Sequence, residues 1–447
     1  MRVAMVGQRG VPATFGGVER AVEELGAELV ARGHDVTVFC RRGYTSGQPS
    51  SYRGMHLRYV PTVDRRGLEA LVPSALSAAL TVTTPFDIVH FHALGPGLFT
   101  PLPKWLSSAG VVQTIHGLAD RRAKWGPLAS RLLATAGWMS ARVPDATIVV
   151  SAALAEHYRR EHGRATATIT NGVRRPLPLP PDFRPPFDLA PLSYLLFVGR
   201  LVPEKAPDLL LRAFARLDTN RRLVIAGGSS HTEDYVEELH ALAARDPRVL
   251  MAGYVHGEEL ARLYAGATAF VLPSLLEGLP LVLLEAAAYA VPIIASDIEP
   301  HVEVLGGIAD PGRRLFRSGD EHDLVEALQH FGYDGPARTA AARLATDVIR
   351  DYTWPAAAAA TEGVYQAVLD ARASHHRFWR PAPSRVGTAT VRPELLADQV
   401  NRVAAAAVPH AHGVPRRREA GEGLQGLAAV GTSESTAEAA VRHQRAQ

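Results

Sequence analysis

Short apolar runs alternate with segments of helical spacing from the first residues of the chain. The run Arg2–Val6 precedes the amphipathic segment Val18–Ala31, and a second run follows at Val36–Cys40. Further runs of the same kind are His56–Val60, Ile88–Phe91, Val111–Ile115 and Thr147–Val150. Runs that are apolar at nearly every position are typical of parallel strands buried on both faces. Because helices separate these strands, the pattern predicts right-handed crossovers and a doubly wound α/β domain.

A proline-rich stretch interrupts this alternation at Arg174–Pro191. Its prolines remove backbone donors and exclude a helix or a central strand, so we interpret it as a semi-rigid linker. The alternation then resumes, which predicts an N-terminal domain over residues 1–173, a linker over 174–192 and a similar C-terminal domain over 193–352. The elements expected in the C-terminal domain are strands at Tyr194–Val198, Arg222–Ala226, Val249–Met251, Ala269–Leu272 and Pro292–Ala295, with helices at Pro207–Leu217, Glu233–Ala244, Glu258–Tyr264 and Leu281–Tyr289. Strand ends of the two domains are expected to face a common cleft.

The last part of the chain changes in character. Two more helices are expected near Glu321–Phe331 and Ala337–Arg350, and a final one over residues 353–373 that can return to the N-terminal domain. From Arg380 the chain is rich in Ala, Arg, Gly, Pro and Ser. Because such a sequence buries too little apolar surface to offset chain entropy, we expect a disordered tail over residues 380–447.

Composition narrows the class of protein. Of 447 residues, 47% are apolar and 21% charged, which excludes a wholly disordered chain. The single cysteine, Cys40, excludes an intramolecular disulfide and a cysteine-built metal cluster, and it favours the cytoplasm. A net charge of +3 does not call for nucleic acid. We expect no signal peptide, because the first apolar run breaks off after six residues at Gly7-Gln8-Arg9, and no transmembrane helix, because no apolar run reaches ~18 residues.

The strongest chemical feature is a pair of glutamates, Glu277 and Glu285, at a strand-to-helix junction. Eight residues of helix span about 12 Å, more than the ~5–9.5 Å of a glycosidase carboxylate pair. The two acids should therefore hold different parts of one extended ligand, with backbone N–H groups of Gly278–Leu281 between them for a phosphate. The alternative is a capping glutamate and a solvated one, which the surrounding leucines disfavour.

Two cations follow the strand at Tyr194–Val198. Arg200 and Lys205 lie where this strand ends, and Lys205 is one of three lysines in an arginine-rich chain. A compact ammonium at this edge suits a diphosphate, with each phosphate contact contributing roughly 1.5–3 kcal/mol when water is excluded. The alternative is a surface pair of Glu204 with Lys205 that contributes almost nothing.

Glycines and histidines mark the ends of N-terminal strands. The loop that ends in Gly16 and Gly17 opens a helix and either binds an anion or merely connects strand to helix; it is not the dinucleotide motif GxGxxG. His116 ends a strand, where it can donate to a sugar hydroxyl, support charge at a reacting carbon or serve only the fold. His90 and His92 have a spacing that a metal can use, but no carboxylate pair or cysteine is near. The chain also lacks Asp-x-Asp, so we expect no metal ion and no cofactor.

These residues together resemble family four of the glycosyltransferases, a retaining class with the GT-B fold of two facing Rossmann-like domains. The resemblance covers Met1 to Ala373, and the opening resembles the bacterial branch that extends surface polysaccharides and lipid-linked glycans. It rests on the Gly16-Gly17 loop, TIHG around His116, Ser151, Asn171-Gly172-Val173, GRLVPEK and Glu277-x7-Glu285.

The resemblance implies a role for each matching position. Arg200 and Lys205 would grip the diphosphate of a nucleotide-sugar donor, and Glu285 would accept hydrogen bonds from both ribose hydroxyls. The donor sugar would be held from the C-terminal domain by Glu277 and the amides of Gly278, Leu279, Pro280 and Leu281, and from the N-terminal domain by His116, Gly16 and Gly17. The sugar would be transferred with retention, the leaving phosphate deprotonating the acceptor, so that no protein base is needed.

The chain departs from the family at two alanines. Ala206 and Ala290 stand where the family usually has glycine, which is tolerable if φ is negative at both. A left-handed backbone at Ala206 would put the diphosphate grip in doubt.

The acceptor side is less defined. The segment Asp120–Arg142 mixes arginines with Trp125 and Trp138, so it either lies on an anionic membrane surface beside a lipid-linked acceptor or simply covers the first sheet. The expected location is the cytoplasm or the inner face of the plasma membrane. The alternatives to a transferase are an epimerase or phosphorylase on the same plan and a non-catalytic nucleotide-sugar-binding protein; a dehydrogenase lacks its glycine fingerprint.

Overall fold

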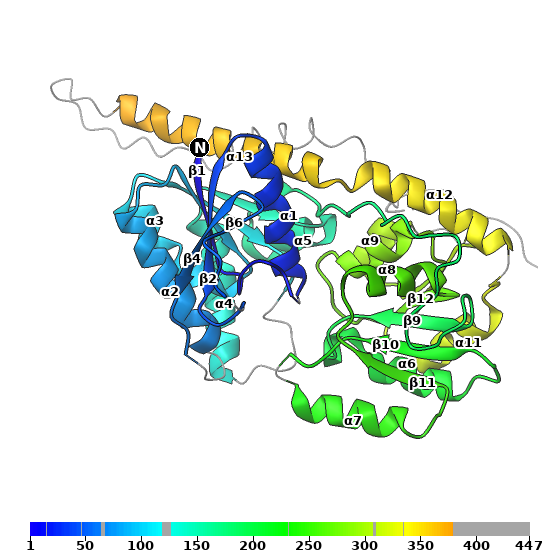
Figure 1. Cartoon of the computed structure of the whole chain (residues 1–447). Helices are drawn as coiled ribbons and strands as arrows, with labels where there is room; N and C mark the ends of the chain where they lie inside the picture. The colour runs from blue at the N-terminus through cyan, green and yellow to red at the C-terminus, as the bar shows by residue number, and fades with distance from the viewer. Residues whose placement is uncertain are drawn as a thin grey trace, which may run out of the picture. The chain divides into compact units, whose positions relative to one another are not determined.

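The computed structural model describes residues 1–378 except positions 15, 46, 64–67, 119–126, 231, 307–309 and 334. All of these described residues belong to one compact unit. The unit contains two sheets, each with helices around it (Figure 1). The expected tail over residues 380–447 lies outside the described residues. Two parallel-sheet α/β domains are present, so the expected fold class is confirmed.

The first sheet has eight strands in the order β3-β4-β2-β1-β5-β6-β7-β8. All neighbours in it are parallel except β3 and β4, which form a hairpin. Its strands are β1 (Arg2–Val6), β2 (Asp35–Arg41), β3 (Ser51–Tyr52), β4 (Met55–Val60), β5 (Ile88–His92), β6 (Gly110–Ile115), β7 (Ala146–Val149) and β8 (Ala167–Thr168). The helices of this half are α1 (Gly17–Ala31), α2 (Leu68–Thr83), η1 (Gly95–Phe99), α3 (Pro101–Leu106), α4 (Pro127–Arg142) and α5 (Ala152–His162).

The second sheet has six parallel strands in the order β11-β10-β9-β12-β13-β14. Its strands are β9 (Tyr194–Val198), β10 (Arg222–Ala226), β11 (Val249–Gly253), β12 (Ala269–Leu272), β13 (Ile293–Ser296) and β14 (Arg313–Phe316). The helices around it are η3 (Pro203–Lys205), α6 (Pro207–Ala215), α7 (Glu233–Ala243), α8 (Gly257–Gly266), α9 (Leu281–Ala288), α10 (Glu299–Leu305), α11 (Glu321–His330) and α12 (Gly335–Asp351). The strand order changes direction at β9, where ligands bind in such sheets.

The last helix, α13 (Trp354–Phe378), leaves the second half and packs beside α1 (Figure 1). Its buried face, including Trp354 and Tyr365, belongs to the same apolar cluster as Val22 and Leu25 of α1. The crossing point is tight, because a Cβ on Gly172 would lie 2.3 Å from the backbone nitrogen of Trp354. A glycine before the linker is therefore needed for the chain to pass α13.

Several elements differ from the expectation. The helix α2, which was not expected from the sequence, continues through Pro73, since a proline in the second turn removes one hydrogen bond while the apolar face still packs on β1 and β4. The helix α10 and the strand β14 were not expected, and α13 continues to Phe378 instead of ending at Ala373. No helix among the described residues is long and apolar enough to cross a membrane.

The structure does not meet the condition of a negative φ at the two alanines. Ala206 has φ 48° and Ala290 has φ 55°, both in the left-handed region that favours glycine. Ala206 joins η3 to α6, so the left-handed turn is what bends the chain between these helices. The turn leaves Lys205 buried beside Glu277. Because a left-handed backbone at Ala206 puts the expected grip on a diphosphate in doubt, that role of Lys205 stays a prediction.

Replacing Ala206 by glycine should stabilise the protein, because it relieves this backbone strain. For Ala206→Gly we expect a gain of about 1 kcal/mol, a rise of ~2–4 °C in thermal unfolding. The control is Ala213→Gly, which places a glycine inside α6 and should lower stability by about 1 kcal/mol. Changes of the same sign in both variants would contradict the strain at Ala206.

Candidate functional site

The loop after β12 carries the first carboxylate of the site. Glu277 forms an ion pair with Lys205, and the hydroxyl of Ser274 donates to Glu277 Oε1 at 2.8 Å. The side chains of Lys205 and Glu277 are only 11% and 10% exposed. The alternative of an exposed Glu204–Lys205 surface pair is therefore wrong, and Lys205 is a buried cation between η3 and the β12 loop.

This pairing fixes the charge on Glu277. Burial alone would raise the pKa of Glu277, but the charges of Lys205 and His301 and the hydrogen bonds of Lys205 and Ser274 hold it below its ordinary value. His301 lies beneath, with Nδ1 2.9 Å from the carbonyl oxygen of Ser296, and burial lowers its pKa to about 4. At neutral pH Glu277 is thus an anion, not a proton donor.

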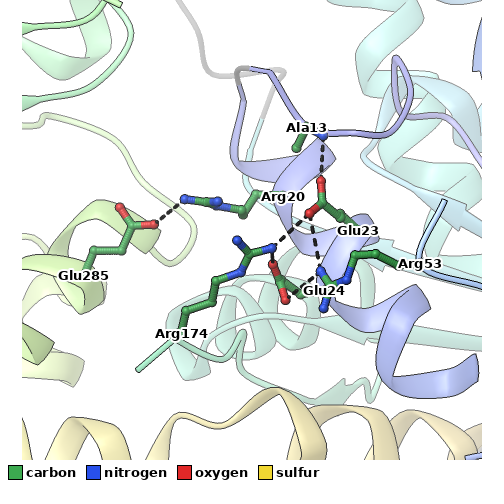
Figure 2. A network of polar contacts seen from close by, with 7 residues as sticks. All are labelled: Ala13, Arg20, Glu23, Glu24, Arg53, Arg174 and Glu285. Carbon is green, nitrogen blue, oxygen red and sulfur yellow. Dashed lines mark hydrogen bonds and ion pairs between the residues drawn. The ribbon is translucent and has the colours of Figure 1, made fainter. Parts of the chain in front are cut away.

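The second carboxylate has a separate set of partners. Arg20 of α1 donates to Glu285 Oε1 at 3.1 Å, and the hydroxyl of Tyr264 in α8 donates to Oε2 at 3.1 Å. Figure 2 shows Arg20 reaching from α1 towards Glu285, which lies on α9. Among the described residues no donor to Glu277 is shared with Glu285, so each carboxylate has its own set of partners. That the two acids do not form a dyad stays a prediction from their spacing.

The start of α9 lies against the glycine loop of the first half. A Cβ on Gly17 would be 3.8 Å from Leu281 Cδ1, so this loop lies next to the first residue of α9. Gly16 has φ 103° and stands immediately before α1. Two carboxylates of α1 hold the loop, because Glu19 accepts from the N–H of Arg9 at 3.1 Å and Glu23 from that of Ala13 at 2.7 Å.

His116 and Gly278 meet even more closely. A Cβ on Gly278 would lie 2.1 Å from the carbonyl oxygen of His116 and 3.1 Å from Cα of Gly117. The turns after β6 and β12 are therefore packed backbone to backbone. The structure thus brings Gly17, His116 and Arg20 from one half next to Leu281, Gly278 and Glu285 from the other.

The histidines near this contact are neutral. His116 Nε2 lies 3.3 Å from His92 Nδ1, and burial lowers the pKa of His116 to about 4. This favours the interpretation of His116 as a hydrogen-bonding group over one that carries positive charge. His90 uses both ring nitrogens, on Tyr365 at 2.6 Å and Thr114 at 2.7 Å. Within the described part of the chain, no three His, Cys, Asp or Glu side chains are grouped to hold a metal ion.

Arg200 and the backbone N–H groups before α9 are the remaining residues that the sequence predicts for the site. Arg200 has no ion-pair partner among the described residues, and its charge together with that of Arg9 acts on the phenol of Tyr254. Of the four amides expected to face a phosphate, Pro280 has no N–H, so only Gly278, Leu279 and Leu281 can donate. Pro280 stands before α9 rather than in its first turn.

Sequence reasoning missed Arg20, Tyr264 and the charged network behind them. Glu23 and Glu24 are buried, and each is contacted by Arg53 and by Arg174, the first residue of the linker (Figure 2). The only available signal for Arg20 was its place one turn after Gly17, and nothing near Tyr264 in the sequence indicates its contact.

Both halves of the chain match known family models. Residues 15–177 match the model described as Glycosyltransferase Family 4, and residues 190–346 match Glycosyl transferases group 1. The D-inositol 3-phosphate glycosyltransferase of Stackebrandtia nassauensis is 28% identical over 422 residues, which cover 83% of this chain and 93% of that protein.

Solved structures of similar fold include an enzyme and a nucleotide complex. Sucrose-phosphate synthase of Thermosynechococcus elongatus has a TM-score of 0.68 at 21% identity, with 83% of this chain and 99% of that chain covered. HepE of Anabaena, in complex with UDP and glucose, has a TM-score of 0.62 at 17% identity, with 84% and 100% covered. The chain is a glycosyltransferase of the GT-B type. In this glycosyltransferase the stretch from Gly278 to Glu285 meets Gly17, Arg20 and His116 of the first half.

The contact between the two turns gives this glycosyltransferase a sharp steric test. Gly278→Ala should reduce glycosyl transfer by more than about tenfold, because its methyl group meets a backbone oxygen that a side-chain rotation cannot move. Gly17→Ala, whose methyl group meets only Leu281 at 3.8 Å, should stay within about threefold of the parent.

Rates of sugar transfer and thermal unfolding are measured for both variants and for Gly95→Ala, where a Cβ meets nothing within 4 Å. Equal activity of the Gly278 and Gly95 variants would show that the two turns need not be in contact during the reaction.

Proposed function

We propose that this glycosyltransferase moves a sugar from a nucleoside-diphosphate donor to a glycan, lipid-linked or small-molecule acceptor, with retention at the anomeric carbon and without a metal ion. The observation that carries the proposal is that the two carboxylates of the site have separate partners. Glu277 is paired with Lys205, whereas Glu285 is bound by Arg20 and Tyr264. A nucleotide sugar has two separate polar ends, the ribose and the hexose, that such carboxylates can hold.

The diphosphate between these ends would meet fixed positive charge. Arg200 is uncommitted among the described side chains, Lys205 is buried, and the N–H groups at the start of α9 have no side-chain cap. Charge-assisted hydrogen bonds to phosphate contribute roughly 1.5–3 kcal/mol each. In our proposal the leaving diphosphate meets Arg200, the Lys205 ammonium that also pairs with Glu277, and a helix N-terminus, without a divalent ion.

The proposed reaction needs no protein base. Glu277 is a weak base because Lys205 stabilises its anionic form, and the low pKa of His116 makes that imidazole a weak base as well. In the proposed step the bond from the anomeric carbon to the phosphate oxygen breaks and the bond to the acceptor oxygen forms on the same face. The acceptor proton passes to the leaving phosphate, so charge and protons balance.

A nucleotide-sugar panel tests this donor assignment. Thermal unfolding is followed with UDP-, GDP- and ADP-sugars in the presence of EDTA, and at least one should stabilise the protein by several degrees. Glu285→Gln should weaken that ligand about tenfold or more. Lys205→Met should weaken nucleoside diphosphates more than the free nucleoside, with thermal unfolding reported for each variant. Stabilisation only after a divalent cation is added, or equal weakening of nucleoside and diphosphate, would contradict the proposal.

The acceptor is proposed to be reached at an anionic membrane surface. Trp105 and Leu106 of α3 are 72% and 62% exposed, and Trp138 of α4 is 53% exposed with the Arg142 guanidinium 4.9 Å from its ring. The opposite face of α4 buries Ala136 and Ser140, so this helix both covers the sheet and leaves an aromatic side chain outside. Exposed tryptophans next to arginines are typical of interfacial contacts. The residues 119–126 of the same expected segment lie outside the described part.

Vesicle sedimentation tests this surface. The protein should bind vesicles that contain 30% phosphatidylglycerol and not vesicles of phosphatidylcholine alone, because the proposed contact needs anionic headgroups. Trp105→Ser combined with Trp138→Ser should reduce binding about fivefold or more. Trp354→Phe, which changes a buried tryptophan of α13, is the control and should bind normally. If the double variant sediments with the anionic vesicles as fully as the parent protein, the proposed membrane contact of Trp105 and Trp138 is wrong.

A further inference from the structure

The carboxylate of Glu285 is oriented by two donors that come from different halves of the chain. Arg20 Nη2 binds Oε1 and the Tyr264 hydroxyl binds Oε2, each at 3.1 Å. The side chain of Glu285 is 20% exposed, whereas Tyr264 is only 1% exposed. The carboxylate therefore has one buried supporting group and one at the surface of the site.

Tyr264 is held rigidly and donates permanently. Its ring is stacked on Tyr289 with a centroid distance of 5.6 Å and an interplanar angle of 14°, and it contacts Phe270 of β12 at 5.9 Å. Burial, and next to it the charge of Glu285, raises the pKa of Tyr264 well above its ordinary value. The phenol thus keeps its proton at any physiological pH, and the carboxylate can only accept from it.

The lone pairs of Glu285 indicate how many hydrogen bonds a ligand can donate to it. Each carboxylate oxygen accepts about two hydrogen bonds, and each oxygen of Glu285 already accepts one from the protein. One acceptor position per oxygen is left. Two adjacent hydroxyl groups, such as those of a ribose, match two acceptor positions that lie side by side on one carboxylate.

We propose that Tyr264 and Arg20 are positioning residues that set Glu285 to read a cis-diol, and so make the site selective for ribonucleotides over 2′-deoxyribonucleotides. The proposal rests on the donor class proposed above. Without its two donors the carboxylate rotates freely about its last bond, and it then meets two hydroxyl groups no better than one. Selectivity for the second hydroxyl is lost before binding itself is lost.

The test compares matched diphosphates. Dissociation constants of UDP, GDP and ADP are measured by calorimetry, and the nucleotide that binds most tightly is compared with its 2′-deoxy form and with inorganic pyrophosphate. Tyr264→Phe and Arg20→Met should each lower the ribo/deoxy ratio about 3- to 10-fold by weakening only the ribonucleotide. Under turnover, KM for the donor should rise with kcat nearly unchanged.

Tyr194→Phe is the matched control. Tyr194 is fully buried in the same half, and its hydroxyl donates at 2.7 Å to the carbonyl of Leu263, the residue before Tyr264 in α8, so this variant loses a buried hydrogen bond on the same helix without removing a donor from Glu285. It should lower thermal stability without changing the ribo/deoxy ratio. Arg20 lies in the other half and is partly exposed. The variant Arg20→Met therefore tests the positioning of Glu285 even if Tyr264→Phe unfolds the protein.

The outcomes distinguish a wrong donor class from a wrong positioning role of Tyr264 and Arg20. If none of the three ribonucleoside diphosphates binds to the parent protein, the proposed donor class is wrong. If one binds with a clear preference over its 2′-deoxy form and the preference survives in both variants, the donor class stands and the positioning role of Tyr264 and Arg20 is refuted. A drop in the ratio for Tyr194→Phe as large as for Tyr264→Phe also refutes it, because the effect is then one of stability.

Discussion

A carboxylate that is removed from water must be matched by a cation or by hydrogen-bond donors, and this constraint organises the site. An unmatched buried charge costs several kcal/mol, so each acid recruits a partner from wherever the fold can supply one. Glu277 takes Lys205, Glu285 takes Arg20 and Tyr264, and the Glu23–Glu24 pair takes arginines from a turn and from the linker. Three of these matches join segments more than seventy residues apart in the chain.

The fold was predictable because its signals are local. Continuous apolar runs such as Ile88–His92 leave few alternatives to a buried parallel strand, and the proline-rich linker divides the two halves without reference to anything distant. The failures were of a different kind. The helix α10 and the strand β14 were not expected, and the left-handed backbone at Ala206 and Ala290 is imposed by neighbouring elements rather than by alanine itself.

The site was predictable only as far as its residues share a short motif. Glu277, Gly278 and Glu285 stand within nine positions, so their chemistry could be inferred together, and Lys205 stood out because lysine is rare in this chain. Their partners could not be inferred. The pairing of Glu285 with Arg20 depends on how α1 and α9 pack, and the tautomer-dependent contact of His92 with His116 depends on the register of β5 with β6. Neither packing nor register is written in a local pattern.

The position of Arg174 determines where the junction of a chimera with a related protein can lie. Its guanidinium contacts Glu23 and Glu24 inside the first half, although the residue opens the proline-rich linker. A chimera that exchanged the second half at the start of the linker would leave two buried acids with Arg53 alone, and it would also lose α13, which packs beside α1. Recombination between relatives is therefore tolerated only when the junction lies beyond Arg174 and the final helix travels with the first sheet.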